Sequence, residues 1–374
     1  MTYAFANGYR IVTPYIHKAM LRVQPEWHGK PLQDYIGHFH FHPPVKIDSG
    51  RLLVSGEKAT PARILKQSDI ISYTFHFHEP EVLSDPVNVI DITDDLVAVN
   101  KPASIPVHPV SSFRKNTVLK ILEHDRPHLF DELGGERLRT LHRLDRPVSG
   151  VLIFGRNKKS ATLFTEGLKS RAIKKEYVAK VKGIFPLGVI KLDQCLNRQS
   201  QFPLRYQADE KGKEAITLFE RVSINEEEDY SIVSCQPVTG VTHQIRAHLQ
   251  YLGYPIVNDI KYGGHSEKSL PVLPKIDYTQ VTDAQTYFDW CENCQLGRRD
   301  TSHYPIEDLV TFSIYLHAMR YALCCSGWAW SFCAPPPKWL NENEVEKIFY
   351  KMNFKDRDYA DNNININNNN NNNF

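Results

Sequence analysis

One carboxylate in the stretch LRTLHRLDRPVSGVLIFGRN lies between two guanidinium groups. Asp145 has Arg143 before it and Arg146 directly after it, and Gly150 precedes an apolar run. One interpretation is an ion pair at the surface, and such pairs contribute little to stability. The other is a nucleophile whose rotamer is fixed by charge-assisted hydrogen bonds. The stretch by itself favours the ion pair, so the rest of the chain must decide between the two.

Two later stretches offer partners for this carboxylate. KKEYVAKVKG, residues 174–183, alternates like a strand and carries Tyr177, whose phenol has a flat face and a titratable hydroxyl. GVTHQIRAHLQYLGYPIVND, residues 240–259, begins with a predicted helix that places Arg246 in its first turn. Taken alone, Tyr177 is more often a core aromatic, so its position relative to the other stretches carries the argument.

The three stretches resemble the motifs of the RluA-like pseudouridine synthases and occur in that family's order. HRLDRPVSG is similar to HRLDxxTSG, with Val148 in place of threonine, and the second motif's tyrosine corresponds to Tyr177. GVTHQIRAHL is similar to GRTHQLRxHL, whose second arginine corresponds to Arg246. Val241 stands where the family usually has an arginine, at the position of an expected polar or RNA contact. With three motifs in order, the ion pair becomes the weaker interpretation of Asp145.

The resemblance extends over roughly residues 8–340. LVAVNKPASIPVHPVSSFRKNTVLKIL is similar to the family's strand and histidine–proline segment. YRIVTPY, HFHEP, CENC and YLHAMRY resemble the eukaryotic branch that modifies the tRNA anticodon stem-loop. The resemblance therefore implies an enzyme that isomerises uridine to pseudouridine in RNA, most simply tRNA, without a cofactor.

The resemblance also implies roles for individual residues. Asp145 would attack the sugar's anomeric carbon or assist elimination through a glycal, and both routes stay open. Tyr177 would hold the released base or move a proton, and Arg246 would bind the carboxylate. Arg143 would fill the gap left by the flipped uridine, because the base must leave its stack to react. In the same motifs, His142 and Ile245 are predicted to bind the substrate.

Basic side chains gather between the first two motifs. Residues 156–175 contain a single acidic residue, Glu166, and seven basic ones, which are Arg156, Lys158, Lys159, Lys169, Arg171, Lys174 and Lys175. Such a density predicts a face that binds the RNA backbone, with Lys158 and Lys159 as substrate-binding residues. The alternative is an ordinary solvated face.

Hairpin and helix patterns predict an α+β fold with a mixed, largely antiparallel sheet and flanking helices. A strand, a turn at Ser55–Gly56 and a second strand are predicted first, and a hairpin is predicted around 93–95. One helix is predicted to begin after Asn116, with Asn116 as its cap, and another to run from Thr242 to Gly253. Residues 76–86 are expected to be a linker.

The predicted domains are a 1–25 N-terminal arm, a 26–80 domain, an 81–340 catalytic domain and a 341–374 tail. The 26–80 domain resembles the ribosomal-protein-S-four-type RNA-binding fold, although its core appears only as GRLLVSG. Residues 265–308 are expected to be an insertion or long loop. The Asn-rich end of the tail cannot form a core and is expected to be disordered.

Composition limits the remaining classes. The chain has 374 residues, 41% of them hydrophobic, a net charge of +2 and seven cysteines, an odd number that argues against a disulfide framework. The N-terminus lacks an apolar secretory region, and no run is long enough to span a membrane. We expect a monomer in the cytoplasm or nucleus, with a mitochondrial location left open because no acidic residue precedes Glu26.

Metal binding and other functions are the remaining alternatives. Alternate histidines are candidate ligands at His38, His40, His42, His76 and His78, but a partly buried strand or an RNA-facing loop is the preferred interpretation. Cys291 and Cys294 would need Cys324, Cys325 or His303 as further ligands, and because that spacing is irregular no metal is predicted. A non-catalytic RNA-binding protein would not need all three motif residues. A glycoside hydrolase usually needs two carboxylates, and the motifs place one. An enzyme that modifies rRNA or mRNA stays open.

Overall fold

The computed structural model describes two compact units. The first comprises residues up to Asp85 together with Ile105–Pro127, and the second comprises Pro86–Ser104 and the rest of the described chain. The residues described are 3–38, 50–110, 112–133, 137–199, 205–264, 312–325 and 328–352. The predicted insertion at 265–308, the Cys291–Cys294 pair with His303, His40 and His42, and the Asn-rich end lie outside them.

The first unit contains a small four-stranded sheet with its own core. Its order is β3 (Tyr15–Arg22), β6 (Ile70–Phe77), β4 (Leu52–Val54) and β5 (Glu57–Lys58), and all neighbours are antiparallel. The turn predicted at Ser55–Gly56 is confirmed, and both residues adopt positive φ. The core includes Trp27, Leu32, Leu52 and Phe75. Trp27 lies in the 3₁₀ helix η1 (Pro25–Trp27) and Leu32 in η2 (Leu32–His38), and both helices follow β3 in the chain. The ribosomal-S-four-like assignment stays a prediction.

The segment 76–86 was expected to be a linker, but residues 76–82 are buried and only its last two residues are exposed. It contains β7 (Val82–Leu83), which joins β1 (Tyr3–Ala6) and β2 (Tyr9–Val12) in a three-stranded sheet. Glu79 is 2% exposed, and its carboxylate accepts backbone N–H groups of Arg114, Lys115 and Asn116 at 2.8–2.9 Å. These charge-assisted bonds offset the cost of burying the charge, so a polar segment becomes part of the interior.

The helix predicted after Asn116 is α1 (Val118–Asp125), but its cap is Thr117. The Thr117 side chain accepts the Lys120 N–H, whereas the Asn116 amide donates to the Pro80 carbonyl at 2.9 Å. Asn116 therefore ties this helix to the buried segment after Glu79, and the adjacent hydroxyl takes the capping role.

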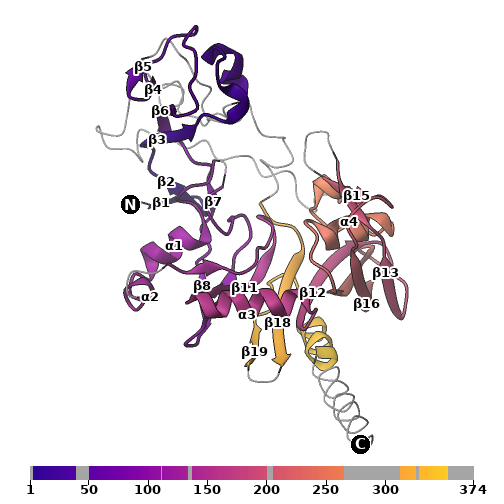
Figure 1. Cartoon of the computed structure of the whole chain (residues 1–374). Helices are drawn as coiled ribbons and strands as arrows, with labels where there is room; N and C mark the ends of the chain where they lie inside the picture. The colour runs from indigo at the N-terminus through magenta and orange to yellow at the C-terminus, as the bar shows by residue number, and fades with distance from the viewer. Residues whose placement is uncertain are drawn as a thin grey trace, which may run out of the picture. The chain divides into compact units, whose positions relative to one another are not determined.

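The second unit is built on a ten-stranded sheet (Figure 1). Eight strands follow the order β13, β16, β17, β12, β18, β11, β9 and β8, with β10 beside β11 and β19 beside β18. Every pairing is antiparallel except that of β11 with β18, which confirms the predicted fold class. Their bounds are β8 (Asn88–Ile92), β9 (Leu96–Lys101), β10 (Arg139–Thr140), β11 (Ser149–Gly155), β12 (Ile173–Lys182), β13 (Val189–Asp193), β16 (Ile216–Asn225), β17 (Tyr230–Pro237), β18 (Leu316–Cys325) and β19 (Trp328–Cys333).

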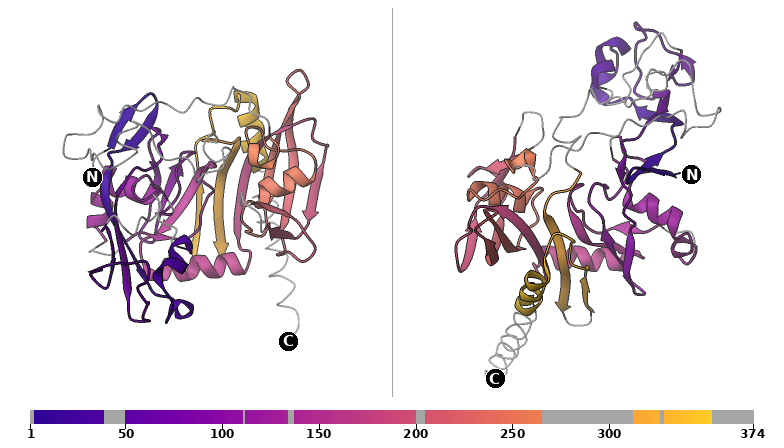
Figure 2. Two further views of the ribbon diagram at one scale, coloured as in Figure 1. Left: turned by 90° about the horizontal axis from the view of Figure 1, so that it is seen from above. Right: turned by 180° about the vertical axis from the view of Figure 1, so that it is seen from behind.

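Helices cover both faces of this sheet. α3 (Lys158–Lys169) and the helical residues 342–352 lie on opposite sides of it (Figure 2). Ile348 and Met352 pack on Val178, Ile232 and Met319, although the sequence assigned them to a tail. Three smaller elements complete the unit's architecture: the short helix α2 (His128–Asp131), the 3₁₀ helix η4 (Ile260–Tyr262), and a hairpin of β14 (Leu196–Arg198) and β15 (Tyr206–Ala208) that contacts α4 (Gln244–Tyr251).

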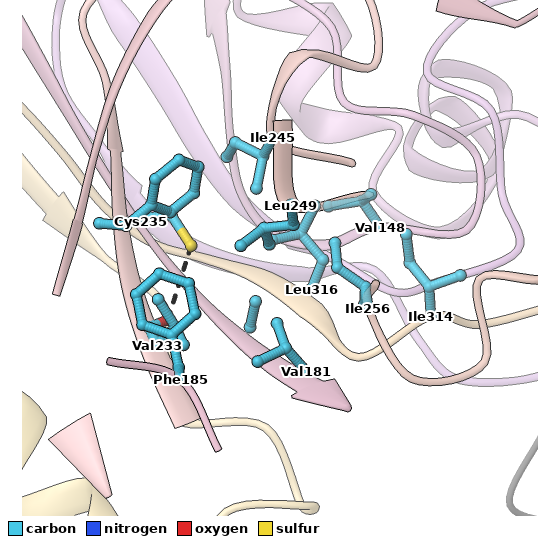
Figure 3. Close-up of a cluster of buried hydrophobic side chains, with 12 residues drawn as sticks. Val148, Val181, Phe185, Val233, Cys235, Ile245, Leu249, Ile256, Ile314 and Leu316 are labelled. Carbon is cyan, nitrogen blue, oxygen red and sulfur yellow. Dashed lines mark hydrogen bonds between the residues drawn. The ribbon is translucent and has the colours of Figure 1, made fainter. Parts of the chain in front are cut away.

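The helix predicted between Thr242 and Gly253 is α4. Gly253 lies past its end with a positive φ, as the sequence predicts. Its apolar residues Ile245 and Leu249 pack in a cluster with Val148, Val181 and others (Figure 3). This packing fixes the helix, and with it Arg246, against the strands that carry the first two motifs.

The sheet forks where β11 meets β18. The two strands pair only at Ser149 with His317 and at Gly150 with Ala318. A Cβ on Gly150 would lie 2.2 Å from the Ala318 carbonyl oxygen, and its φ is +111°, so only glycine fits this crossing. Pairing continues from Ala318 to Tyr177, which places the tyrosine beside the loop that carries Asp145.

Among the described residues, no helix is long and apolar enough to cross a membrane. The same part of the chain contains no group of three or more histidine, cysteine or acidic residues placed to hold a metal ion.

Candidate active site

Asp145 lies in the loop between β10 and β11 and is held by Arg246. The Arg246 Nη1 donates to Asp145 Oδ2 at 2.9 Å, and the aspartate side chain is 25% exposed. Burial alone would raise the pKa of Asp145, but the charges of His243, when its ring is protonated, and of Arg246 lower it below the ordinary value. The carboxylate is therefore ionised at neutral pH and restricted to one rotamer.

Arg246 is itself fixed by a second carboxylate. Its Nε and Nη2 donate to Oδ2 and Oδ1 of Asp259 at 2.7 and 2.9 Å, and Asp259 is fully buried. Although burial disfavours its charge, Asp259 and Asp145 raise the pKa of Arg246, which stays cationic. This bidentate pair leaves Nη1 as the group that faces Asp145.

Both contacts of the Asp145 carboxylate within the described chain fall on one oxygen. His243 Nε2 lies 3.6 Å from Oδ2, the same atom that accepts from Arg246. The other oxygen, Oδ1, is thus the one available to a substrate. A carboxylate held by one oxygen, with no contact on the second among the described residues, suits nucleophilic attack.

Tyr177 is paired with a residue that the sequence analysis missed. Its hydroxyl forms a hydrogen bond with the hydroxyl of Tyr321 on β18, and the two rings meet edge to face. Burial, Tyr321 and the Asp145 charge raise the pKa of Tyr177 well above its ordinary value. The phenol is therefore neutral. The YLHAMRY segment contains Tyr321, but its pairing depends on the sheet register.

The other predicted substrate residues lie in different environments. His142 accepts the Ile153 N–H through Nε2 at 3.0 Å, and its ring stacks on Tyr321 and Phe164. Burial lowers the pKa of His142 to about 3, so the ring is neutral and supports the aromatic layer beneath Tyr177. Ile245 is 6% exposed and packs in the core (Figure 3). Arg143 is exposed.

Lys101 is a second residue that the sequence analysis did not single out. Its ammonium is fully buried and donates to the carbonyls of Pro102, Arg146 and Val148 at 2.7–3.1 Å. Burial lowers the pKa of Lys101 well below its ordinary value. The three bonds fix the backbone on the carboxyl side of Asp145. The NKP segment was visible in the sequence, but its contact with this loop was not.

The basic run between the motifs is divided by the fold. Arg156 pairs with Glu132, Arg171 pairs with Glu214, and Lys175 donates to the Thr239 carbonyl. Lys158 and Lys159 are exposed in the first turn of α3. Asp145 precedes β11, and the first turn of α3 follows the other end of that strand. The seven residues of β11 therefore separate the two lysines from Asp145 by about 20 Å.

Val241, which replaces an expected arginine, packs beside the small cluster formed by Leu196, Ala215, Ala247 and Tyr262. Its backbone N–H donates to the Gln244 side chain at 2.9 Å. An apolar contact thus occupies this position.

Comparison with known proteins identifies the family of the chain. The family model of RNA pseudouridylate synthases matches residues 95–251. RNA pseudouridine synthase 7 of Arabidopsis thaliana is 35% identical over 368 residues, which cover 91% of this chain and 88% of that protein. The mitochondrial tRNA pseudouridine(32) synthase of Saccharomyces cerevisiae is 36% identical over 68% of this chain and 54% of that protein. The tRNA pseudouridine(31) synthase of the same yeast is 31% identical over 70% of this chain and 74% of that protein. The chain therefore belongs to the RluA-like family of RNA pseudouridine synthases, isomerases that convert uridine in RNA to pseudouridine.

Proposed function

We propose that this enzyme modifies a uridine in tRNA, in the anticodon stem-loop, with Asp145 as its nucleophile. The observation that carries the assignment is the buried Asp259–Arg246 pair, which holds Asp145 by Oδ2 alone. The three motifs, all of whose residues are described, contain two other carboxylates, Glu176 and Asp259, and an arginine binds both oxygens of each.

The reaction exchanges one bond from the sugar for another. The bond from C1′ to N1 of uracil breaks, and a bond from C1′ to C5 forms. The C5 proton leaves to solvent, and N1 gains a proton, so no external oxidant or reductant is needed. Asp145 would either bond to C1′ or assist loss of the 2′ proton. In both routes the neutral Tyr177 hydroxyl can exchange a proton with the sugar or the base.

The tRNA assignment is supported by two relatives whose names specify tRNA, both from yeast. Pseudouridines should be mapped across total RNA from cells with and without this protein. We expect a uridine of the tRNA anticodon stem-loop to stay unmodified without it. Loss of pseudouridine only from rRNA or mRNA would show that the substrate is one of those RNAs and not tRNA. If the pseudouridines are unchanged, and the purified protein binds RNA but forms no pseudouridine, the result would support a non-catalytic role.

We also propose that Lys158 and Lys159 contact RNA phosphates at a distance from the reacting uridine. Each phosphate contact releases counterions, so its loss flattens the dependence of log K on log salt. Changing both lysines to alanine should weaken RNA binding and reduce the slope by about one unit per lost contact. Fluorescence titrations at several salt concentrations measure both quantities.

The matched control changes two exposed lysines elsewhere, Lys191 on β13 and Lys347 in the 342–352 helix. We expect their slope to equal that of the unchanged protein. An unchanged slope in the Lys158/Lys159 variant would show that the start of α3 faces away from RNA.

For residues 26–80 we propose an accessory role in RNA binding. Lys30, Lys58 and Lys66 are exposed on this part of the chain, which supplies positive charge without any of the three motifs. We further propose that the enzyme acts as a monomer in the cytoplasm or nucleus. The mitochondrial name of the yeast relative keeps mitochondria as the alternative.

A further inference from the structure

His243 has a backbone conformation that histidine rarely adopts. It directly precedes α4, and its φ of 57° and ψ of 18° lie in the left-handed region. Left-handed backbone is unfavourable for a non-glycine residue and persists where surrounding contacts impose it. Its carbonyl accepts the Ala247 N–H at 2.9 Å, and its ring is held by side-chain contacts. The strained backbone of His243 therefore fixes the position of the ring, which the start of α4 by itself would not determine.

The hydrogen bonds of the ring determine which nitrogen carries the proton. His243 Nδ1 lies 2.8 Å from the hydroxyl of Tyr262, and that hydroxyl accepts the backbone N–H of Tyr206 at 2.9 Å. A phenol has a single proton. Because the Tyr206 N–H can only donate, the Tyr262 proton is available to His243 Nδ1. A neutral His243 then carries its own proton on Nε2.

Several charged groups surround this ring. Asp145 and Asp259 favour its protonation, whereas Arg246 and Lys261 oppose it. Burial outweighs all of them and lowers the pKa of His243 to about 4, so the ring is neutral at physiological pH. The Nε2–H group faces Asp145 Oδ2 at 3.6 Å, beside the Arg246 donor on the same oxygen.

We propose that His243 is a positioning residue for Asp145, and that Tyr262 fixes its tautomer. The assignment rests on the nucleophilic role proposed for Asp145. The Nε2–H dipole keeps Oδ2 turned towards Arg246 and leaves Oδ1 for the substrate. A neutral donor orients the carboxylate without adding a second full positive charge, which would weaken the nucleophile.

The two functions of Tyr262 can be separated. Its ring covers the Arg246 guanidinium at 4.8 Å, and its hydroxyl contacts His243. Tyr262→Phe keeps the ring and removes the hydroxyl. Without that proton, His243 can place its proton on Nδ1, and the Nε2 lone pair then faces the carboxylate.

We expect Tyr262→Phe to lower the single-turnover rate about tenfold at pH 7, with RNA affinity unchanged. In Tyr262→Phe the neutral imidazole of His243 also loses the hydrogen bond from the Tyr262 hydroxyl that stabilised it, so the pKa of His243 should rise. The variant's rate should therefore acquire a pH dependence between about 5 and 7 that the unchanged enzyme lacks. A purely structural defect would lower the rate equally at every pH. Tyr251→Phe, on the exposed end of α4, is the matched control.

Nitrogen-15 shifts of labelled histidine give a direct second measurement. We expect the Nε2–H tautomer of His243 in the unchanged protein and a mixture in Tyr262→Phe. Because loss of an acceptor for the Tyr206 N–H can destabilise that variant, His243→Gln and His243→Leu form a second pair. Glutamine keeps a donor and should retain severalfold more activity than leucine.

Asp145→Asn measured in parallel separates the two proposals. Near-normal turnover by Asp145→Asn would contradict the nucleophile itself. An inactive Asp145→Asn together with a Tyr262→Phe rate and pH profile like those of Tyr251→Phe would contradict only the role of His243. An Nδ1–H tautomer in the unchanged protein would contradict it as well.

Discussion

Replacing Asp145 with asparagine is expected to reduce pseudouridine formation by at least about a thousandfold, the scale seen when a nucleophile is removed. Asparagine has nearly the same shape, and its amide oxygen can still accept from Arg246. It cannot act as a carboxylate towards C1′. Because Arg246 keeps its bidentate pair with Asp259, the fold should be retained. RNA affinity should also be kept, since no group that binds phosphate is lost.

The measurement follows from the chemistry. RNA labelled with tritium at uracil C5 releases its label when C5 bonds to the sugar, so single-turnover release reports the isomerisation. A separate binding titration shows whether the RNA is still bound. Asp94→Asn, in the exposed turn between β8 and β9, is the matched control and should behave like the unchanged enzyme. A rate within about tenfold of normal would contradict the assignment of Asp145.

The sequence predicted the residues that meet at this site because they lie within short motifs. Asp145, Tyr177 and Arg246 each stand in a stretch of fewer than about ten residues whose spacing is independent of the rest of the fold. Strand alternation and helix boundaries were also local, which is why the Ser55–Gly56 turn and the α4 helix are confirmed. Local patterns thus recover the elements and the stretches that contain the candidate site residues.

What supports those residues comes from distant parts of the chain. Tyr321 is 144 residues from Tyr177, and Lys101 is 47 from Val148, and their contacts depend on sheet register. The buried Glu79 illustrates a related failure. A charged segment reads as a linker unless one knows that backbone N–H groups will surround its carboxylate.

Proximity in sequence also misleads. Lys158 and Lys159 lie close to the first motif along the chain, yet an extended strand carries them to its opposite end. A basic run near a catalytic motif therefore predicts a charged surface, and the strand that separates them decides how far it lies from the chemistry.

Replacing Arg246 with methionine is expected to reduce both stability and activity. Arg246 is 4% exposed and lies between Asp145 and the fully buried Asp259. Its removal leaves the Asp259 charge without compensation, which should lower the free energy of unfolding by about 3–5 kcal/mol. It also frees the Asp145 rotamer. Urea unfolding at neutral pH and single-turnover kinetics measure the two losses.

A second substitution distinguishes these two effects. In Arg246→Met/Asp259→Leu the uncompensated charge is gone, and replacing a whole buried ion pair with apolar residues is often nearly neutral for stability. We expect the double variant to recover most of the unfolding free energy while its activity stays as low as that of the single variant. Arg156→Met is the control for the loss of a paired arginine. It removes the arginine that pairs with Glu132 beyond the far end of β11, and the variant should keep its chemical rate.

Recovery of turnover together with stability would show that Arg246 supports only the fold, because a restored scaffold would then suffice to orient Asp145. Continued inactivity in a stable protein would place the guanidinium in the reaction itself, where its remaining N–H group holds the carboxylate that attacks the sugar.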